Sequence, residues 1–346
     1  MNAAAPRLVR RARVDLKDFP VDAAWAPDGA RALVGLGEGA LALIDLRGAE
    51  PAVTEIGRHA GGVLAVAWQA AGARFATSGQ DGRVLLWDAR TLESRELIAQ
   101  SEWCEHLAFA RNGKWLAVAV QKQLRIFDGE GVERASFANQ PGVINALAWR
   151  PKPPTEIAAV SQGGAHVYEL EPRPDTLALR WNAACMTASW SPDGRILAAG
   201  MRENGVHYWN LPAGTQSEMK GYPGKVTLTG FSGNNRFLAT GAGELIVVWN
   251  VGGDGPEGSV PLQLKEHSDR LTQLAFQPEG ALLASGARDR RVLLWQPAQG
   301  TTPIDADLLG EEVALLRWSR DGQRLLAGDR AGALAVYALS ASSAVR

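Results

Sequence analysis

The stretch FATSGQDGRVLLWD, residues 75–88, recurs in nearly the same form as LLASGARDRRVLLWQ, residues 282–296. In both stretches an apolar segment containing a serine or threonine is followed by a short polar turn, then by a second apolar segment that reaches a tryptophan. Short apolar segments separated by Gly and Asp are typical of β-strands joined by tight turns. Each stretch therefore predicts a β-hairpin, and the recurrence indicates an internal repeat.

The same pattern occurs eight times along the chain, each time led by an aromatic residue. The leading aromatics are Trp25, Trp68, Phe109, Trp149, Trp190, Phe231, Phe276 and Trp318. Their spacings are 43, 41, 40, 41, 41, 45 and 42 residues. Regular self-similarity at about 40–45 residues is a signature of the blades of a β-propeller.

Each unit contains four short apolar segments, the number that a four-stranded blade requires. In the second unit these segments are VLAVAW, RFATS, RVLLWD and SRELIA. Helical periodicity of useful length is absent from the sequence, so the fold class expected from the periodicity is all-β.

The chain resembles the WD-repeat (WD40) β-propeller proteins from about residue 13 to residue 340. The segments LLWDA, HYWNL, VVWNV and LLWQP vary the Trp-Asp dipeptide that names this family. Eight units predict a single eight-bladed WD40-type propeller; the alternative is seven blades with a displaced unit. The expected domains are a flexible N-terminal arm at 1–12, the propeller at 13–340 and a C-terminal tail at 341–346.

The ends of the chain predict how the ring closes. RARVDLKD, residues 11–18, is an isolated strand candidate, and the last unit stops after ALAVYAL, residues 333–339, without a fourth strand. In the family that the chain resembles, the N-terminal segment typically supplies this missing outer strand. We therefore expect Val14 to Leu16 to pair with Ala333 to Tyr337, which removes an exposed strand edge.

Composition limits the function classes. The chain has 346 residues and is 46% hydrophobic, and its 36 basic and 37 acidic residues give a net charge of −1. The lack of a basic excess argues against nucleic acid as the partner. No apolar run approaches the roughly 18 residues of a membrane span, and no signal peptide is recognisable, so we expect a cytoplasmic protein without membrane contact. The excess of Arg over Lys, 29 to 7, suggests a bacterial genome rich in G and C.

The second and seventh repeat units contain polar residues at identical spacing. His59, Thr77, Asp81 and Trp87 follow one another at steps of 18, 4 and 6 residues, and so do His267, Ser285, Asp289 and Trp295. A hydroxyl, a histidine and an aspartate invite comparison with a hydrolase triad. The resemblance implies instead a structural tetrad, in which Asp binds His, His binds the hydroxyl and the hydroxyl binds the indole N–H. We interpret both sets as structural because such a network satisfies its own polar groups.

The fifth and sixth units have lost this pattern. At the histidine position they carry Trp181 and Tyr222, and at the aspartate position Glu203 and Gly243. Two interpretations stay open: drift compensated by apolar packing, or a surface adapted to a partner. The cysteines, Cys104 and Cys185, form no C-x-x-C pair, so we expect buried free thiols, and the sequence indicates neither a metal site nor a cofactor.

The resemblance implies that partners bind the top face, where the second and third strands of each blade are connected. Projected by their position in the repeat, the basic residues that reach this face are Arg202, Lys225, Arg270, Arg288 and Arg330, with Trp103 and Phe19 on the other half. We expect a monomeric, non-catalytic scaffold that binds an acidic or phosphorylated protein or peptide there. The alternative is a propeller enzyme or small-anion-binding protein that uses the mouth of the central channel. Its case is weak, because the projected positions supply only Glu105 and Glu312 as acids and no histidine.

Overall fold

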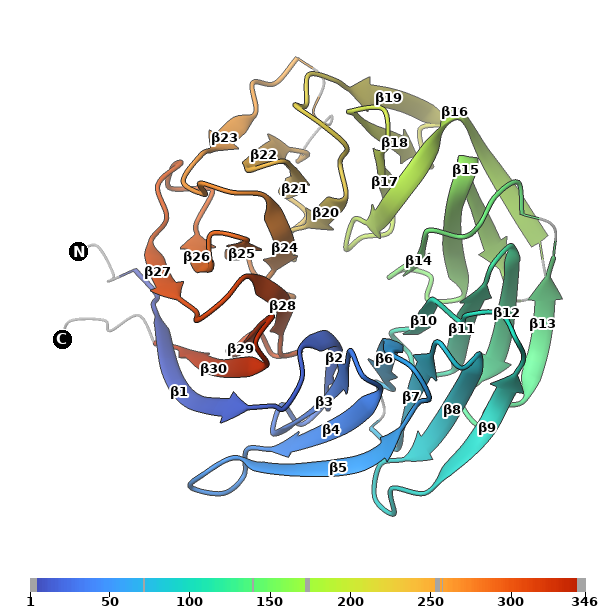
Figure 1. The fold of residues 1–346 in the computed structure, drawn as a ribbon. Coiled ribbons are helices and arrows are strands. Elements are labelled where there is room, and N and C mark those ends of the chain that lie inside the picture. The colour runs from blue at the N-terminus through green and yellow to red at the C-terminus, as the bar shows by residue number, and fades with distance from the viewer. Residues whose placement is uncertain are drawn as a thin grey trace.

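The computed structural model describes residues 5–70, 72–138, 140–171, 175–252, 256 and 258–340. Within these residues all regular secondary structure is β: thirty strands form seven antiparallel sheets. The sheets follow one another around a central axis (Figure 1). The predicted all-β propeller is confirmed.

Six sheets have four strands and one has six. The first three along the chain are β2 (Pro20–Trp25), β3 (Arg31–Leu36), β4 (Ala40–Asp45) and β5 (Ala52–Arg58); β6 (Val63–Trp68), β7 (Arg74–Gly79), β8 (Arg83–Asp88) and β9 (Ser94–Ala99); and β10 (His106–Phe109), β11 (Trp115–Val120), β12 (Gln123–Asp128) and β13 (Glu133–Phe137). The six-stranded sheet consists of β14 (Ala146–Trp149), β15 (Glu156–Glu169), β16 (Asp175–Trp190), β17 (Ile196–Met201), β18 (Val206–Asn210) and β19 (Thr215–Met219). The last three are β20 (Leu228–Phe231), β21 (Phe237–Ala242), β22 (Leu245–Asn250) and β23 (Leu262–Leu264); β24 (Leu271–Phe276), β25 (Leu283–Ala287), β26 (Arg291–Trp295) and β27 (Asp305–Leu308); and β28 (Val313–Trp318), β29 (Arg324–Asp329), β30 (Ala333–Leu339) and β1 (Leu8–Asp15).

The expectation of eight separate four-stranded blades is wrong, and the alternative of seven blades fits the sheet count. The fourth and fifth repeat units share the six-stranded sheet. Strand β15 pairs with β14 through its first half and with β16 through its second, and β16 continues without a break into the segment that pairs with β17. The sequence of β16, DTLALRWNAACMTASW, has no Gly or Pro to end the strand. The two units are therefore joined, rather than one of them being displaced.

The leading aromatic of every repeat unit is the last residue of a strand near the axis. Four of these aromatics connect neighbouring units, because their indole N–H donates to a backbone oxygen on the adjacent inner strand. The bonds run from Trp25 to Arg317 (2.9 Å), from Trp149 to Ala108 (2.9 Å), from Trp190 to Ala148 (3.0 Å) and from Trp318 to Ala275 (3.0 Å). Each acceptor immediately precedes the leading aromatic of its own unit, so one repeated residue fixes the contact between inner strands.

Strand β1 closes the ring as the sequence predicts. Val14 pairs with Leu334 and Asp15 with Ala333, and the pairing extends to Leu8 opposite Leu339. The expected flexible arm at 1–12 is therefore too long, since β1 already begins at Leu8. The strand starts earlier because β30 continues to Leu339 and offers an edge along the whole of 8–15, with a register shift between Arg10 and Ala12. Residues 1–4 and the expected tail at 341–346 lie outside the described residues.

The hydrophobic core lies between neighbouring sheets. At the closure, Val14 and Leu16 join a buried cluster with Val34 and Ile44 of the first sheet and Leu326 of the last. Burying an aliphatic side chain of this size contributes about 1.5–3 kcal/mol. The two halves of the six-stranded sheet also share a buried cluster, so they pack on each other as separate sheets do elsewhere in the ring.

Candidate partner-binding site

The first set of four spaced polar residues comes together in the sheet β6–β9. His59 Nδ1 lies 2.9 Å from Asp81 Oδ1, and His59 Nε2 lies 2.9 Å from Thr77 Oγ1. The indole N–H of Trp87 donates to the same hydroxyl oxygen over 3.0 Å. Asp81 also accepts the backbone N–H of Ala60, so the carboxylate ties the loop before β6 to the turn after β7.

The second set repeats this geometry in the sheet β24–β27. His267 Nδ1 lies 2.9 Å from Asp289 Oδ2, His267 Nε2 lies 2.8 Å from Ser285 Oγ, and Trp295 Nε1 donates to that oxygen over 2.8 Å. Burial lowers the pKa of His267, with the Asp289 contact acting in the opposite direction. Burial alone would raise the pKa of Asp289, but hydrogen bonds to its carboxylate, led by that of the Arg291 N–H, hold it below the usual value.

Access separates these networks from an active site. Thr77 and Ser285 are both fully buried, with 0% of their surface exposed. A nucleophile must reach the substrate, and neither hydroxyl can. The buried thiols are equally unsuited: burial raises the pKa of Cys104 to about 11 and that of Cys185 to about 12, so both are neutral at pH 7.

The sixth unit keeps a polar network with a different residue. The Tyr222 hydroxyl lies 2.8 Å from Thr240 Oγ1 and accepts the indole N–H of Trp249 over 2.9 Å. Tyrosine thus contacts the hydroxyl as histidine does elsewhere, and it also accepts the indole N–H that the hydroxyl accepts in the complete networks. In the fifth unit Trp181 stacks on His207 instead, with ring centroids 3.8 Å apart. Both arrangements are compensated packing inside the sheet, which favours drift over adaptation to a partner.

Three of the predicted basic residues line one hollow on the top face. Arg270 precedes β24, Arg288 follows β25 and Arg330 follows β29, and together they border a hollow of about 450 Å³. The other residues that line it are Phe19, Pro20, Val21, Thr227, Leu271, Thr272, Gln273, Val313 and Ala314. We call this hollow the arginine pocket. It is bounded by loops from four successive repeat units, because the connections before the inner strands and the turns after the second strands meet there.

Backbone hydrogen bonds position the arginines. The N–H of Arg288 donates to the carbonyl of Arg270 over 3.0 Å, and the N–H of Arg330 donates to the carbonyl of Glu312 over 3.0 Å. Each bond ties the turn after a second strand to the loop before the inner strand of the same sheet. The strands therefore fix where the side chains start, while the guanidinium groups remain exposed.

One carboxylate stands among the three guanidinium groups. Glu312 Oε2 lies 3.3 Å from Arg330 Nε and 3.6 Å from Arg288 Nε. The guanidinium carbon of Arg330 also lies 6.0 Å from the centre of the Phe19 ring, which is 37% exposed. Arg270 forms no ion pair with any described residue. The position of Glu312 was visible in the repeat, but its contact with two arginines depends on side-chain directions that the sequence does not give.

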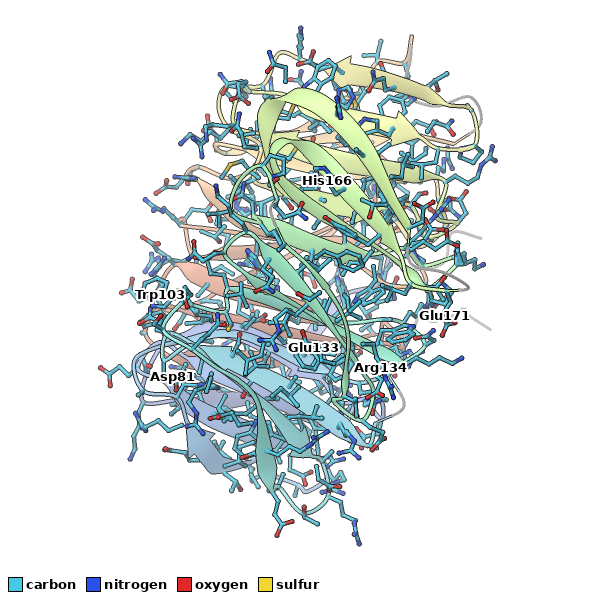
Figure 2. The ribbon with its side chains drawn as sticks, turned by 90° about the vertical axis from the view of Figure 1, so that its right-hand side faces the viewer. Asp81, Trp103, Glu133, Arg134, His166 and Glu171 are labelled. Carbon is cyan, nitrogen blue, oxygen red and sulfur yellow. The ribbon has the colours of Figure 1, made fainter. Side chains whose placement is uncertain are left out.

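The other predicted site residues are exposed but lie outside the arginine pocket. Arg202 follows β17 and Lys225 precedes β20, and neither lines the hollow. Trp103, 47% exposed, belongs to the loop between β9 and β10. Figure 2 shows Trp103 and Asp81 toward one face and Arg134 and Glu171 toward the other. The structure thus gathers three of the six predicted residues and leaves three dispersed.

A polar network that the sequence did not reveal lies along the inner strands beside this pocket. Arg317 Nη2 donates to Asp22 Oδ1 over 2.8 Å, and Arg317 Nη1 donates to Gln273 Oε1 over 3.2 Å. Asp22 Oδ2 in turn accepts the N–H of Val66 on β6. The network links four successive inner strands and fixes Gln273, which lines the arginine pocket. Asp22 and Gln273 lie three positions before their leading aromatics and Arg317 lies one position before its own, so no single repeat position signalled the network.

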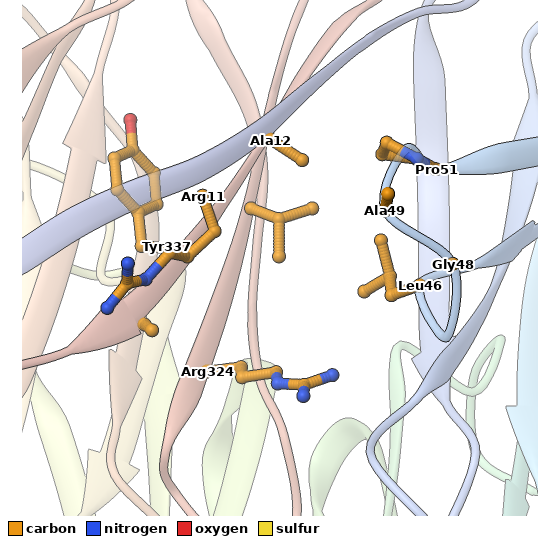
Figure 3. A pocket seen from close by; sticks show the side chains of 10 residues that line it. Arg11, Ala12, Leu46, Gly48, Ala49, Pro51, Arg324 and Tyr337 are labelled. Carbon is orange, nitrogen blue, oxygen red and sulfur yellow. The ribbon is translucent and has the colours of Figure 1, made fainter.

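Other hollows also carry arginines, but several of these already have acceptors. The seam between β1 and the turn after β4 encloses about 290 Å³, bordered by Arg11 and Arg324 among mostly apolar residues (Figure 3). Arg324 Nη1 is already bonded to the carbonyl of Gly29. On the face opposite the arginine pocket, a hollow of about 370 Å³ lies among leading aromatics and is crossed by an ion pair between Arg111 and Glu279, 2.9 Å apart. In this hollow Arg317 donates to Asp22 and Arg320 to the carbonyl of Ala70. No helix among the described residues is long and apolar enough to cross a membrane.

Comparison with known protein families identifies two of the repeat units. The family model of the WD domain, G-beta repeat, matches residues 51–88 and 258–296. These two segments contain both hairpins with the complete polar networks. The protein is a β-propeller in which two segments match the WD40 repeat.

Eukaryotic proteins of low identity are among the relatives of this chain. The chain is 25% identical over 267 residues to telomerase protein component 1 of Rattus norvegicus, covering 69% of this chain and 10% of the relative. It is 23% identical over 242 residues to protein transport protein sec13 of Aspergillus fumigatus (68% and 63%), and 26% over 153 residues to small ribosomal subunit protein RACK1 of Schizosaccharomyces pombe (44% and 39%). The matched region is less than two thirds of the length of each of these relatives. The bacterial origin suggested by composition stays a prediction.

Proposed function

We propose that this propeller is a non-catalytic scaffold that binds an acidic segment of a protein or peptide through its top face, at the arginine pocket. Three arginines from separate loops converge there in a protein whose total charge is −1, and this observation carries the proposal. A local positive field of this kind attracts anionic segments. Arginine supplies forked donors for carboxylate and phosphate groups.

The surroundings of the arginines favour a peptide over a small free anion. Phe19 offers an exposed apolar ring beside Arg330, and aromatic residues together with arginine are enriched at the energetic centres of interfaces. The names of several relatives describe parts of assemblies, such as THO complex subunit 3 of Arabidopsis thaliana and the small ribosomal subunit protein RACK1. An interaction role agrees with these names. The cytoplasmic location and the monomeric state stay predictions.

The test measures binding of a fluorescein-labelled poly-glutamate peptide by anisotropy at several salt concentrations. We expect the protein to bind this peptide and the double variant Arg270→Glu, Arg288→Glu to bind it at least about tenfold more weakly, with a flatter salt dependence. Exposed substitutions shift stability by roughly 0.5 kcal/mol or less, so both proteins should melt at similar temperatures. A peptide that binds the double variant as tightly as the parent would show that the surface is elsewhere.

A matched control reverses two arginines on the opposite face. Arg90 lies in the turn between β8 and β9 and Arg195 in the turn between β16 and β17, and both are exposed without an ion pair among the described residues. The variant Arg90→Glu, Arg195→Glu has the same net charge as the pocket variant. We expect it to retain binding. Equal losses in both variants would indicate a non-specific charge effect and would contradict the proposal.

A further inference from the structure

The charges of the arginine pocket do not balance. Arg270, Arg288 and Arg330 supply three positive charges. Among the described residues, Glu312 is the one acid that forms an ion pair with these arginines, namely with Arg288 and Arg330. Asp269 adjoins the pocket in sequence and keeps its charge, but it does not line the hollow and forms no ion pair with these arginines; its carboxylate accepts the backbone N–H of Arg270. The four charges that meet in the pocket therefore sum to about +2. A group bound there is best matched if it carries two negative charges.

The contacts of Glu312 are loose enough to be displaced. Its Oε2 meets both guanidinium groups through their Nε atoms, at 3.3 and 3.6 Å. Charge-assisted N–H···O bonds normally measure about 2.7–2.9 Å. The terminal nitrogens of Arg288 and Arg330 have no hydrogen-bond acceptor among the described residues. These terminal nitrogens can bind a second anion while Glu312 stays at the Nε atoms. They can also bind it after Glu312 has turned away toward solvent.

We infer that the arginine pocket binds a phosphorylated serine or threonine of a partner peptide, and that Glu312 is an internal counter-ion that limits the pocket's affinity for singly charged groups. The inference rests on the proposed function and names its ligand more closely. A phosphoryl group carries about −1.5 to −2 charges at pH 7 and three acceptor oxygens. A carboxylate neutralises one of the two uncompensated positive charges, whereas a phosphoryl dianion can match both.

The shape of the pocket supports a side chain of a peptide rather than a free ion. The exposed ring of Phe19 lies on the Arg330 side, where it can pack against an apolar residue next to the phosphorylated one. The pocket opens on the top face between loops of four repeat units, so an extended peptide can cross it. The apolar contact supplies affinity that inorganic phosphate cannot obtain.

The experiment compares three labelled peptides of one sequence, Gly-Leu-X-Leu-Gly, where X is phosphoserine, aspartate or serine. We expect the phosphoserine peptide to bind at least about tenfold more tightly than the aspartate peptide, and the serine peptide not to bind measurably. Inorganic phosphate, added as competitor, should displace the phosphopeptide only at concentrations at least about tenfold above the peptide's own Kd. If phosphate binds as tightly as the phosphopeptide, the pocket is a small-anion site and the inference is wrong.

The variant Glu312→Gln tests the role of the counter-ion directly. Removing the negative charge of Glu312 should tighten binding of the aspartate peptide on the order of tenfold. Binding of the phosphoserine peptide should tighten by a larger factor, because the dianion has about twice the charge of a carboxylate and is repelled by Glu312 more strongly. The neighbouring exposed Glu311, which does not line the arginine pocket and forms no ion pair among the described residues, supplies the control Glu311→Gln. Unchanged affinities in Glu312→Gln, or equal gains in both variants, would overturn the counter-ion role.

The outcomes separate the two proposals. If Arg270→Glu with Arg288→Glu abolishes poly-glutamate binding while phosphoserine and aspartate peptides bind equally, the scaffold proposal survives and the phosphoryl inference fails. If neither peptide class binds the parent protein, both fail. Circular dichroism and melting temperature of each variant show whether a loss of binding reflects a loss of fold.

Discussion

At the scale of single residues, the buried polar networks determine which substitutions a repeat unit can accept without loss of stability. The aspartates that end these networks are the most informative positions, because removing one leaves a buried histidine nitrogen without an acceptor. Asp81 and Asp289 have almost no exposed side-chain surface, 9% and 5%. Their environments are alike although they are more than two hundred residues apart in sequence.

We predict that Asp81→Ala and Asp289→Ala each lower the free energy of unfolding by about 1–3 kcal/mol, the cost of an unsatisfied buried polar group. Chemical denaturation monitored by tryptophan fluorescence measures this change. The control is Asp15→Ala on β1, where the carboxylate is 71% exposed and the expected change is below about 0.5 kcal/mol. Normal stability in both network variants would mean that the histidine contacts do not contribute to the fold. Lost peptide binding at full stability would instead assign them to the binding site.

Buried histidines predict an acid-sensitive fold. Four histidines have pKa values below the usual value, and burial is the main cause in each case: His106, His166, His207 and His267. The unfolded chain, with histidine pKa values near 6.5, therefore binds more protons than the folded protein below that pH. Stability is complete above about pH 6.5 and declines as the pH falls toward the lower pKa values of the folded state.

We expect the urea midpoint at pH 5.5 to be lower than at pH 7.5, with a smaller difference in the variant His207→Gln. His207 is 1% exposed and has one hydrogen-bond partner, Gln216, 3.2 Å away. Identical midpoints at the two pH values would show that these imidazoles are not held neutral in the folded protein.

At the scale of strands, the closure by β1 is the element on which the ring depends. It covers the outer edge of β30 and places Val14 and Leu16 in the cluster between the first and last sheets. An uncovered strand edge is a template for association between chains. The other outer strands follow the preceding strand of their own sheet directly along the chain, whereas β1 reaches its sheet only from the opposite end of the chain.

Deletion of residues 1–17 should lower the melting temperature and cause concentration-dependent association, measured by light scattering during size-exclusion chromatography. Deletion of residues 1–6 leaves β1 complete and serves as control, with monomer behaviour like that of the full chain. A monomeric 1–17 deletion of unchanged stability would mean that the ring does not need its outer strand.

At the scale of the whole molecule, the two faces differ. The top face carries the arginine pocket, while the opposite face is spanned by the Arg111–Glu279 ion pair, which joins the turn after β10 to the turn after β24 across the axis. Both side chains are more than half exposed, 53% and 69%. Solvent therefore screens the attraction, and isolated surface pairs contribute about 0–1 kcal/mol.

We predict that Arg111→Ala changes the free energy of unfolding by less than about 1 kcal/mol and leaves peptide binding at the arginine pocket unaffected. Denaturation and the anisotropy titration check both parts. A larger loss of stability, or weaker binding, would show that the pair couples the two faces through the ring.

The sequence by itself determined the class, the repeat and the closure. Period and turn residues are local properties, so the eight leading aromatics could be placed on inner strands, and the pairing of β1 with β30 followed from a missing strand. The two complete polar networks were equally visible, because a histidine, a hydroxyl residue, an aspartate and a tryptophan recur at identical spacing within two repeat units. The WD40 family model matches the two segments that contain both hairpins, in agreement with the resemblance seen in the sequence.

Only the tertiary structure decided how many sheets form and which surface residues share a site. The sheet count depends on whether hydrogen bonding continues through residues 175–190, and a repeat count cannot reveal that continuity. The arginine pocket depends on where long, flexible side chains turn after their loops meet in space. The repeat placed six residues on one face, but packing brought only Arg270, Arg288 and Arg330 together and set Glu312 among them. Strand pairing follows local pattern, whereas the meeting of side chains from different sheets follows from the closed ring.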